Sequence, residues 1–208
     1  MSGKTRRGKR WMDEHVEDEF VRRARQEGWR SRAVYKLMEI QERDRILKPG
    51  MTVVDLGAAP GAWSQYSARL LGGRGRVVAL DVLPMDPLPG VDFIQGDFRE
   101  APVLAALEEA LGEAKVDLVL SDMAPNISGM TAVDQPRAMH LVELALEFAR
   151  QRLAPGGSFV AKFFHGAGAA ELVAEARRDF AKVRTRKPKA SRDRSREDFL
   201  VARNYRVR

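Results

Sequence analysis

The 208-residue sequence contains no cysteine. This absence excludes a disulfide framework, a thiolate zinc or iron–sulfur site, and any mechanism with a cysteine nucleophile. No apolar run approaches the roughly 20 residues of a membrane-spanning helix. The basic residues 1–10 lead into a polar stretch instead of the apolar core of a secretory signal. The three histidines have no metal-ligand spacing with acidic residues. We therefore expect a soluble cytoplasmic protein without a bound metal.

Charge is unevenly distributed along the chain. The net charge is +7, but residues 1–10 carry +5 and residues 182–208 carry +8, so the remaining 171 residues sum to −6. A mildly acidic body with two basic ends favours an enzyme core that binds a polyanion such as nucleic acid. The alternative is that both ends are solvated tails that serve solubility alone.

Short apolar strands alternate with amphipathic helices from residue 52 onward. Strands are predicted at residues 52–56, 76–80, 91–94, 116–120, 158–164, 183–186 and 199–202. Helices are predicted from Ser31, as a plausible N-cap, to Pro49 and at residues 62–71, 101–111, 138–153 and 169–180, with a polar loop at residues 122–136.

This alternation predicts an α/β fold, a seven-stranded and mainly parallel sheet with helices on both faces. The last two strands are joined by about a dozen residues without a helical pattern, so we expect the last strand to be antiparallel. We expect residues 1–30 to form a basic, irregular and partly flexible segment, and residues 31–208 a single domain with basic C-terminal strands.

A glycine-bearing turn follows the first strand, in the stretch Val54–Trp63. Gly57 and Gly61 allow a ligand to approach the backbone closely. In an open α/β sheet, nucleotide-like ligands bind at this end of the first strand. The turn matches neither G-x-G-x-x-G nor G-x-x-x-x-G-K-[ST], which disfavours a nicotinamide or nucleoside-triphosphate ligand.

An aspartate follows each of the next two strands. Asp81 can accept hydrogen bonds from both hydroxyls of a ribose, and Asp97 from the exocyclic amine of adenine. Recognition of ribose and adenine without a pyrophosphate motif points to S-adenosylmethionine as the cofactor. The alternative is that the glycines only form a tight turn and that both aspartates cap helices.

Five segments carry a resemblance to a known family: Ser31–Leu37 (SRAVYKL), Asp55–Gly61 (DLGAAPG), Ser121–Asn126 (SDMAPN), Ala161–Phe163 (AKF) and Ser195–Glu197 (SRE). From about residue 30 to residue 202, the chain resembles the FtsJ/RrmJ family of ribosomal RNA 2′-O-methyltransferases. The resemblance implies a Rossmann-like, class I methyltransferase fold. It also implies a uridine substrate in the aminoacyl-site loop of 23S ribosomal RNA, methylated on the assembled large subunit. Ala62 is a mild departure, because a second glycine is common there.

The resemblance also implies functional residues. The catalytic tetrad of the family falls on Lys36, Asp122, Lys162 and Glu197. Cofactor contacts are implied or expected at Gly57, Ala58, Pro60, Gly61, Trp63, Asp81, Asp97 and Asp122. We expect the protein to act as a monomer.

The residue types of the tetrad suit the chemistry. Transfer of a methyl group from a sulfonium to a hydroxyl is an in-line displacement, and the hydroxyl must lose its proton. A lysine, with a reference pKa of about 10.4, acts as a base only when a nearby cation and desolvation lower that value. Lys36 is the natural second cation for Lys162, which interrupts an apolar strand where an unpaired charge is costly. We therefore assign Lys162 as the proton acceptor, oriented by Asp122, with Lys36 and Glu197 positioning the ribose.

Less specific interpretations remain open. Lys36 alone could be a solvated helix residue, and Glu197 a surface ion pair of little energetic value. A cap-type or other RNA 2′-O-methyltransferase would share the tetrad. A non-catalytic RNA-binding factor for ribosome assembly could retain the fold, and activity on purified RNA or on particles would distinguish it.

Overall fold

The computed structural model describes residues 19–126, 128–192 and 195–207. Its strands are β1 (Thr52–Leu56), β2 (Arg76–Asp81), β3 (Val91–Gln95), β4 (Val116–Ser121), β5 (Leu153–Phe164), β6 (Phe180–Arg186) and β7 (Glu197–Tyr205). Its helices are α2 (Glu19–Gln26), α3 (Val34–Asp44), α4 (Ala62–Leu71), α5 (Ala101–Leu111), α6 (Thr131–Arg152) and α7 (Ala169–Asp179). Across these ranges, no helix combines the length and apolar character needed to cross a bilayer.

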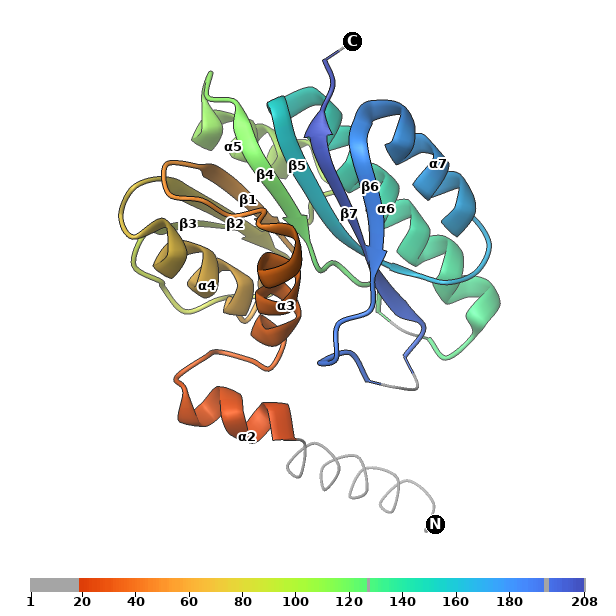
Figure 1. Ribbon diagram of the computed structural model, residues 1–208, viewed down its shortest axis with the longest axis horizontal. Helices are drawn as coiled ribbons and strands as arrows, with labels where there is room; N and C mark the ends of the chain where they lie inside the picture. Colours follow the sequence, from red (N-terminus) through yellow and green to blue (C-terminus); the bar gives the residue numbers. More distant parts are fainter. Residues whose placement is uncertain (1–18, 127, 193–194, 208) are drawn as a thin grey trace.

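All seven strands form one sheet in the order β3-β2-β1-β4-β5-β7-β6 (Figure 1). The first five strands pair in parallel, whereas β7 lies between β5 and β6 and is antiparallel to both. The strand order reverses between β1 and β4, where the carboxyl ends of parallel strands leave room for ligands. The predicted sheet, with its antiparallel last strand, is confirmed.

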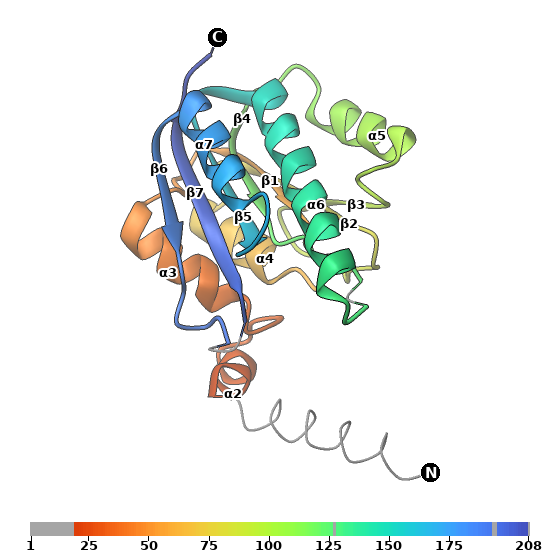
Figure 2. The same cartoon turned by 90° about the vertical axis from the view of Figure 1, so that its right-hand side faces the viewer.

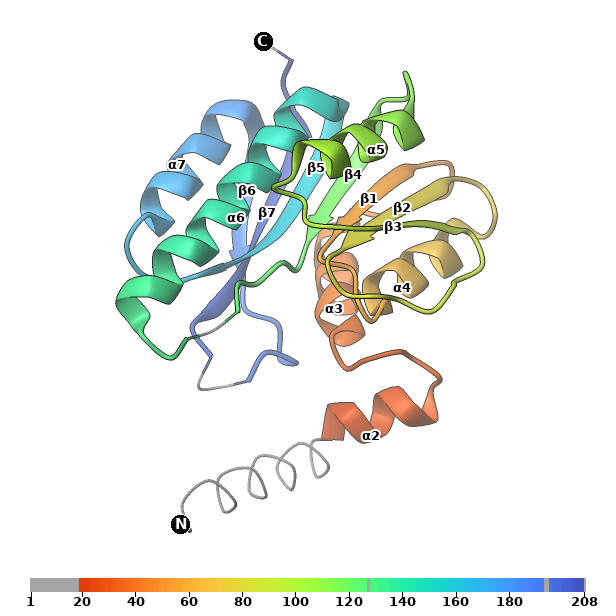
Figure 3. The same cartoon turned by 180° about the vertical axis from the view of Figure 1, so that it is seen from behind.

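Two apolar layers hold the helices to the sheet. One layer packs α5, α6 and α7 on one face, around buried side chains such as Leu107, Leu146 and Leu172 (Figures 2 and 3). The other packs α3 and α4 on the opposite face, around Leu37 and Trp63. Burial of each side chain of this size contributes on the order of 1.5–3 kcal/mol to the free energy of folding. Packing on both faces therefore supports the carboxyl edge of the sheet, where the parallel strands end.

Helix α2 lies within the segment that was expected to be irregular. Its Val21 and Ala24 are buried, and it packs beside α3 and α4 against Tyr35. The eight-residue helix has too short a periodic pattern to stand out among charged neighbours, so the expectation was wrong for residues 19–26. Residues 1–18, which include the basic stretch, lie outside the described part of the chain.

Several predicted boundaries differ from the structure. Ser31 was predicted as the N-cap, but helix α3 begins later, at Val34. The Ser31 hydroxyl instead accepts a hydrogen bond from the Ala33 amide at 3.2 Å, in the turn that precedes the helix. Helix α6 begins at Thr131 and contains Pro136, so the loop after β4 is shorter than predicted. A proline in the second helical turn removes a single backbone hydrogen bond, and the buried face of α6 continues past it.

Strand β5 also starts earlier than predicted, at Leu153 instead of Ser158. Leu153 pairs with Val116, and pairing resumes between Ser158 and Leu118 after a register shift. The intervening Pro-Gly-Gly residues therefore form a bulge within the strand and not a separate loop. The predicted helix over 169–180 ends one residue earlier, because Phe180 already belongs to β6.

Candidate active site

The glycine-bearing turn after β1 is bonded to the neighbouring strand β2. The amides of Gly57 and Ala58 donate to the Leu80 carbonyl at 2.8 and 3.1 Å. Gly57 has a φ of +75°, and a Cβ there would lie 2.8 Å from the Met123 main chain. Glycine is therefore required at this position, because it permits both the backbone angle and the close approach of the chain that follows β4.

Asp81, at the end of β2, faces this turn. One carboxylate oxygen accepts from the Ala59 amide at 2.9 Å and the other from the Leu83 amide at 2.8 Å. The structure therefore brings Asp81 beside the predicted cofactor-binding turn. A carboxylate has about four acceptor positions, so Asp81 keeps acceptor capacity for a further ligand.

Asp97 and Trp63 have partners that the sequence did not reveal. The Arg99 guanidinium bonds to both oxygens of Asp97, and this hydrogen bonding lowers the pKa of the carboxyl group. The Trp63 indole is buried, and its Nε1 donates to the Ala33 carbonyl at 2.8 Å. Its ring also lies 5.6 Å from that of Phe199, centroid to centroid. The Trp63 side chain therefore joins α4 to the start of α3.

Arg30 is a contributor to this region that sequence reasoning missed. Its guanidinium donates to the carbonyls of Pro60, Asp86 and Pro87 at 3.1, 2.7 and 2.8 Å. It thereby holds the loop between β2 and β3 against the glycine-bearing turn. Gly61, with a φ of +101°, lies under this contact, and a Cβ there would approach Met85 Sδ to 2.7 Å. The loop and the turn form one fixed wall.

Lys162 and Asp122 form a largely buried pair at the carboxyl edge. Lys162 Nζ lies 2.9 Å from Asp122 Oδ1, with side-chain exposures of 9% and 19%. The aligned hydrogen bond, however, runs from Nζ to the Asp122 main-chain carbonyl at 2.8 Å, since Oδ1 is not oriented to accept one. Ser121 and Ala161 are register partners of β4 and β5, so the next residue of each strand falls beside the other.

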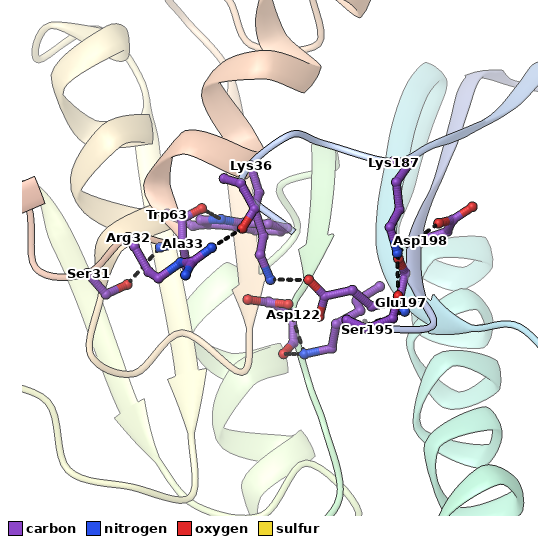
Figure 4. A network of polar contacts seen from close by, with 12 residues as sticks. Ser31, Arg32, Ala33, Lys36, Trp63, Asp122, Lys187, Ser195, Glu197 and Asp198 are labelled. Carbon is purple, nitrogen blue, oxygen red and sulfur yellow. Dashed lines mark hydrogen bonds and ion pairs between the residues drawn. The ribbon is translucent and has the colours of Figure 1, made fainter. Parts of the chain in front are cut away.

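Lys36 of α3 and Glu197 of β7 form a second pair at the same edge. Lys36 Nζ lies 2.6 Å from Glu197 Oε1, and both side chains are 12% exposed. Figure 4 shows this pair with Asp122 beside it. Four residues spread over 161 positions of the chain therefore meet as two cation–carboxylate pairs. Exposed pairs contribute little to stability, but pairs this shielded from water fix the positions of their charges.

Polar contacts between α3 and the β6–β7 connection hold Glu197 near Lys36. Arg186 bonds to both oxygens of Asp44 at 2.8 Å, and the Lys189 amide donates to Glu39 at 2.7 Å. A planar guanidinium makes such two-point bonds to a carboxylate with high geometric specificity.

Two further cations bind the same connection. Lys187 Nζ donates to the main-chain carbonyl of Glu197 at 2.7 Å. Arg32 donates to the Ala190 carbonyl, and burial lowers the pKa of its guanidinium, with the Arg192 charge as the next cause. The basic residues near the chain end therefore include structural cations, which the sequence alone suggested only as polyanion ligands.

The comparisons with known proteins agree with this geometry. A family model described as FtsJ-like methyltransferase matches residues 29–205. The chain belongs to this family. A ribosomal RNA large subunit methyltransferase E from Dichelobacter nodosus is 62% identical over 197 residues, which cover 94% of each chain. The protein of the same name from Legionella pneumophila is 57% identical over 202 residues, or 97% of this chain and 98% of that one.

A solved structure from Plasmodium falciparum, described as a ribosomal RNA methyltransferase, matches with a TM-score of 0.77 and 32% identity. The match covers 85% of this chain and 98% of that chain. The Rossmann-like methyltransferase fold expected from the resemblance is thus confirmed. The FtsJ-like family model spans all four tetrad positions and the glycine-bearing turn.

Asp55, within the family's glycine-bearing segment, is fully buried. Its Oδ2 accepts from the Ser64 hydroxyl at 2.6 Å, whereas Oδ1 has no hydrogen-bond partner among the described residues. Burial raises the pKa of this carboxyl to about 7, and the nearby charges of Asp122 and Asp81 add to the shift. The protein therefore holds a carboxyl group that resists ionisation on the strand that leads into the glycine-bearing turn.

This raised pKa predicts a pH-dependent stability. In the unfolded chain Asp55 ionises near pH 4, but in the folded protein near pH 7, so the free energy of unfolding falls as pH rises between these values. The total loss is roughly 4 kcal/mol for a shift of about three units. Asp55→Asn is expected to remove this component. The free energy of unfolding of the variant minus that of the wild type should therefore increase from pH 4 to pH 7. Denaturant unfolding across this range measures it, and parallel pH profiles would contradict the assignment.

Proposed function

We propose that this protein uses S-adenosylmethionine to methylate a ribose 2′-hydroxyl in large-subunit ribosomal RNA, at a uridine in the aminoacyl-site loop of 23S RNA. The observation that carries the proposal is the meeting of two lysine–carboxylate pairs at the sheet edge, directly beside the glycine-bearing turn. The names of the 57–62% identical relatives support ribosomal RNA of the large subunit as the substrate. No second function has a comparable arrangement of side chains behind it.

The residues at the turn fit the cofactor. At positions 57 and 61 a Cβ would collide with Met123 and Met85, so glycine lets the neighbouring segments close on the turn and leaves its main chain as the surface for contact with the ligand. We assign Gly57, Ala58, Pro60 and Gly61 to that contact, with only the main chain of Trp63 adjoining it. Asp81 would accept from the ribose hydroxyls, and Asp97, although bonded to Arg99, from the adenine amine. S-adenosylmethionine supplies a methyl group made electrophilic by a sulfonium.

The tetrad then performs the proton chemistry. When bound, S-adenosylmethionine would supply the methyl group to the ribose 2′-oxygen and leave as the neutral thioether. The hydroxyl proton would pass to Lys162 Nζ in its neutral amine form, after the ammonium has released the proton that it carries in the ion pair. Asp122 orients Nζ, both through its carboxylate and through its main-chain carbonyl. Lys36 and Glu197 hold the ribose so that oxygen, methyl and sulfur are in line, because displacement rewards such alignment.

Binding of the RNA requires contacts beyond one nucleotide. The basic segment of residues 1–30 and the exposed cations of the β6–β7 connection, Lys189, Arg192 and Arg196, are suited to phosphates. Within the described part of the chain, α2 adds the exposed Arg22 and Arg25 on the same side of the molecule as that connection (Figure 1). We propose that a single copy of the protein acts in the cytoplasm on the large subunit.

The proposed substrate is tested by mapping ribose methylations in ribosomal RNA from cells with and without the gene. We expect the loss of one 2′-O-methyl group in the large-subunit RNA, restored when purified protein and S-adenosylmethionine are added to large subunits. Free RNA serves as the comparison substrate. An unchanged methylation map would contradict the proposal, and restored subunit assembly without methylation would support a non-catalytic assembly factor instead.

The assignment of Lys162 as the base makes a second prediction. Lys162→Ala should lower the single-turnover rate at least ~10²-fold, the lower end of general base catalysis, with cofactor affinity nearly unchanged. Lys162→Arg should be almost as slow, because a guanidinium stays protonated. Lys115→Ala, at the opposite end of β4, is the matched control. Near-normal turnover of the arginine variant would replace the base by a purely electrostatic role.

Cofactor binding through Asp81 makes a third prediction. Asp81→Ala removes the acceptor of the ribose hydroxyls and should cost on the order of 1–3 kcal/mol of binding free energy, which weakens the affinity about 5- to 150-fold. Asp81→Asn, which keeps one carbonyl acceptor, should lie between this variant and the wild type. Calorimetry on folded protein measures the affinity, with the exposed Asp92→Ala as control. An affinity equal to wild type in Asp81→Ala would rule the contact out.

A further inference from the structure

A cavity of about 250 Å³ lies beyond the carboxyl ends of β4 and β5, and one of its lining residues, Arg196, directly precedes Glu197 of the tetrad. Its walls come from the chain after β4, the first turns of α6, the end of β5 and the residue before β7, with Pro125, Gln135, Phe164 and Arg196 among the lining side chains. The volume is roughly eight times the share of one water molecule in the liquid. It is therefore large enough for one flat heterocycle but not for a folded RNA segment.

The strand order places this cavity on the far side of the tetrad from the cofactor turn. The turn and Asp81 follow β1 and β2, whereas the cavity lies beyond β4, toward β5 and β7. Phe164 is two residues after Lys162 on one strand, so both side chains leave the sheet on the same face. Arg196 directly precedes Glu197. In an in-line transfer the accepting hydroxyl lies opposite the methyl donor, so the rest of the accepting nucleotide extends toward this cavity.

We propose that the cavity receives the base of the nucleotide that is methylated, and that Gln135 selects a pyrimidine with an N–H group at ring position 3. This inference rests on the proposed function and names the part of the site that reads the base. Enzymes that work on one nucleotide of an RNA commonly turn its base out of the stack into such a pocket.

The orientation of the Gln135 amide is set by its neighbours. Its nitrogen donates to the main-chain carbonyls of Phe164 and Ala167, at 3.1 and 3.4 Å. Carbonyls only accept hydrogen bonds, so the amide nitrogen must face them, and the amide oxygen remains as an acceptor. That oxygen has no donor among the described residues. Gly166 leaves room for this arrangement, because a Cβ there would lie 2.8 Å from the Gln135 nitrogen.

An acceptor at this position discriminates between the two pyrimidines. Uracil carries an N–H at ring position 3, which can donate to the Gln135 oxygen, whereas cytosine carries a lone pair there. Cytosine would thus leave two buried acceptors facing one another, and an unpaired polar group is penalised more than a missing bond. Phe164 and Arg196 are among the lining residues, and both are of the residue types on which bases stack.

The cavity wall is already formed in the protein without RNA. Asp134, in the first turn of α6, accepts from the amide and hydroxyl of Ser128 at 2.9 and 2.7 Å and from the Gly129 amide at 2.9 Å. These bonds, led by that from the Ser128 amide, lower the pKa of Asp134. The residue thus stays ionised and fixes the short loop at the cavity mouth, which reduces the ordering that a base must bring about on binding.

The test compares two substrates that differ only in the base of the target nucleotide. Large subunits are reconstituted with RNA that carries either uridine or cytidine at the methylated position, and kcat/KM is measured for each. We expect wild type to favour uridine, and Gln135→Ala to reduce this preference at least ~10-fold, by loss of activity on uridine and by relief of the opposed acceptors on cytidine. Gln135→Leu, which keeps the side-chain volume, should reduce it similarly.

Gln151→Ala is the matched control, because Gln151 lies at the other end of α6 and bonds to the exposed Glu147. Thermal unfolding and cofactor affinity establish that each variant is folded. An unchanged uridine preference in both folded Gln135 variants would overturn the inference, as would a wild type that methylates both substrates equally. A wild type that methylates neither substrate would contradict the proposed function itself, so the two failures are distinguishable.

Discussion

The ammonium group of Lys162 lies within an otherwise apolar strand, and a charge buried there is stable only with a partner. Asp122, the first residue after the neighbouring strand β4, is that partner. This pairing constrains the arrangement of the strands at the carboxyl edge of the sheet. β4 and β5 must run in parallel and in register, so that each ends beside the other. The cofactor turn after β1 then lies on one side of the buried pair, and the cavity beside α6 on the other.

The second pair depends on contacts far from the sheet. Lys36 reaches the edge from α3, and Glu197 from the start of β7, where the β6–β7 connection could otherwise move freely. Asp44, Glu39 and the basic residues of that connection fasten it to α3. The same stretch of sequence therefore has two kinds of cation. Some, such as Arg186, are bonded within the protein, and others, such as Arg196, are exposed.

Much of the fold follows from local pattern. Buried strands such as Thr52–Leu56 and helices such as Ala101–Leu111 have strong periodicity, and their bounds were predicted closely. The errors came from local signals that the tertiary structure overrides. Pro136 was interpreted as part of a loop, but it lies on the exposed side of α6, whose buried face begins two residues later at Ala138. Residues 154–157 were interpreted as a break, but strand pairing on both sides of them absorbs the bulge.

The sequence by itself determined the alternating α/β order, the glycine-bearing turn and the residue types of the four central side chains. Each of these features depends on a short contiguous segment, whose hydrophobic periodicity or residue motif is visible without the fold. Only the tertiary structure decided which of those residues meet. It paired Lys36 with Glu197 and Lys162 with Asp122. It also packed the Trp63 indole against the start of α3, and it placed Arg30 at the turn and Gln135 in a cavity wall. These outcomes depend on side chains from distant segments sharing one small volume, where burial and hydrogen bonding, which no local spacing encodes, select the partners.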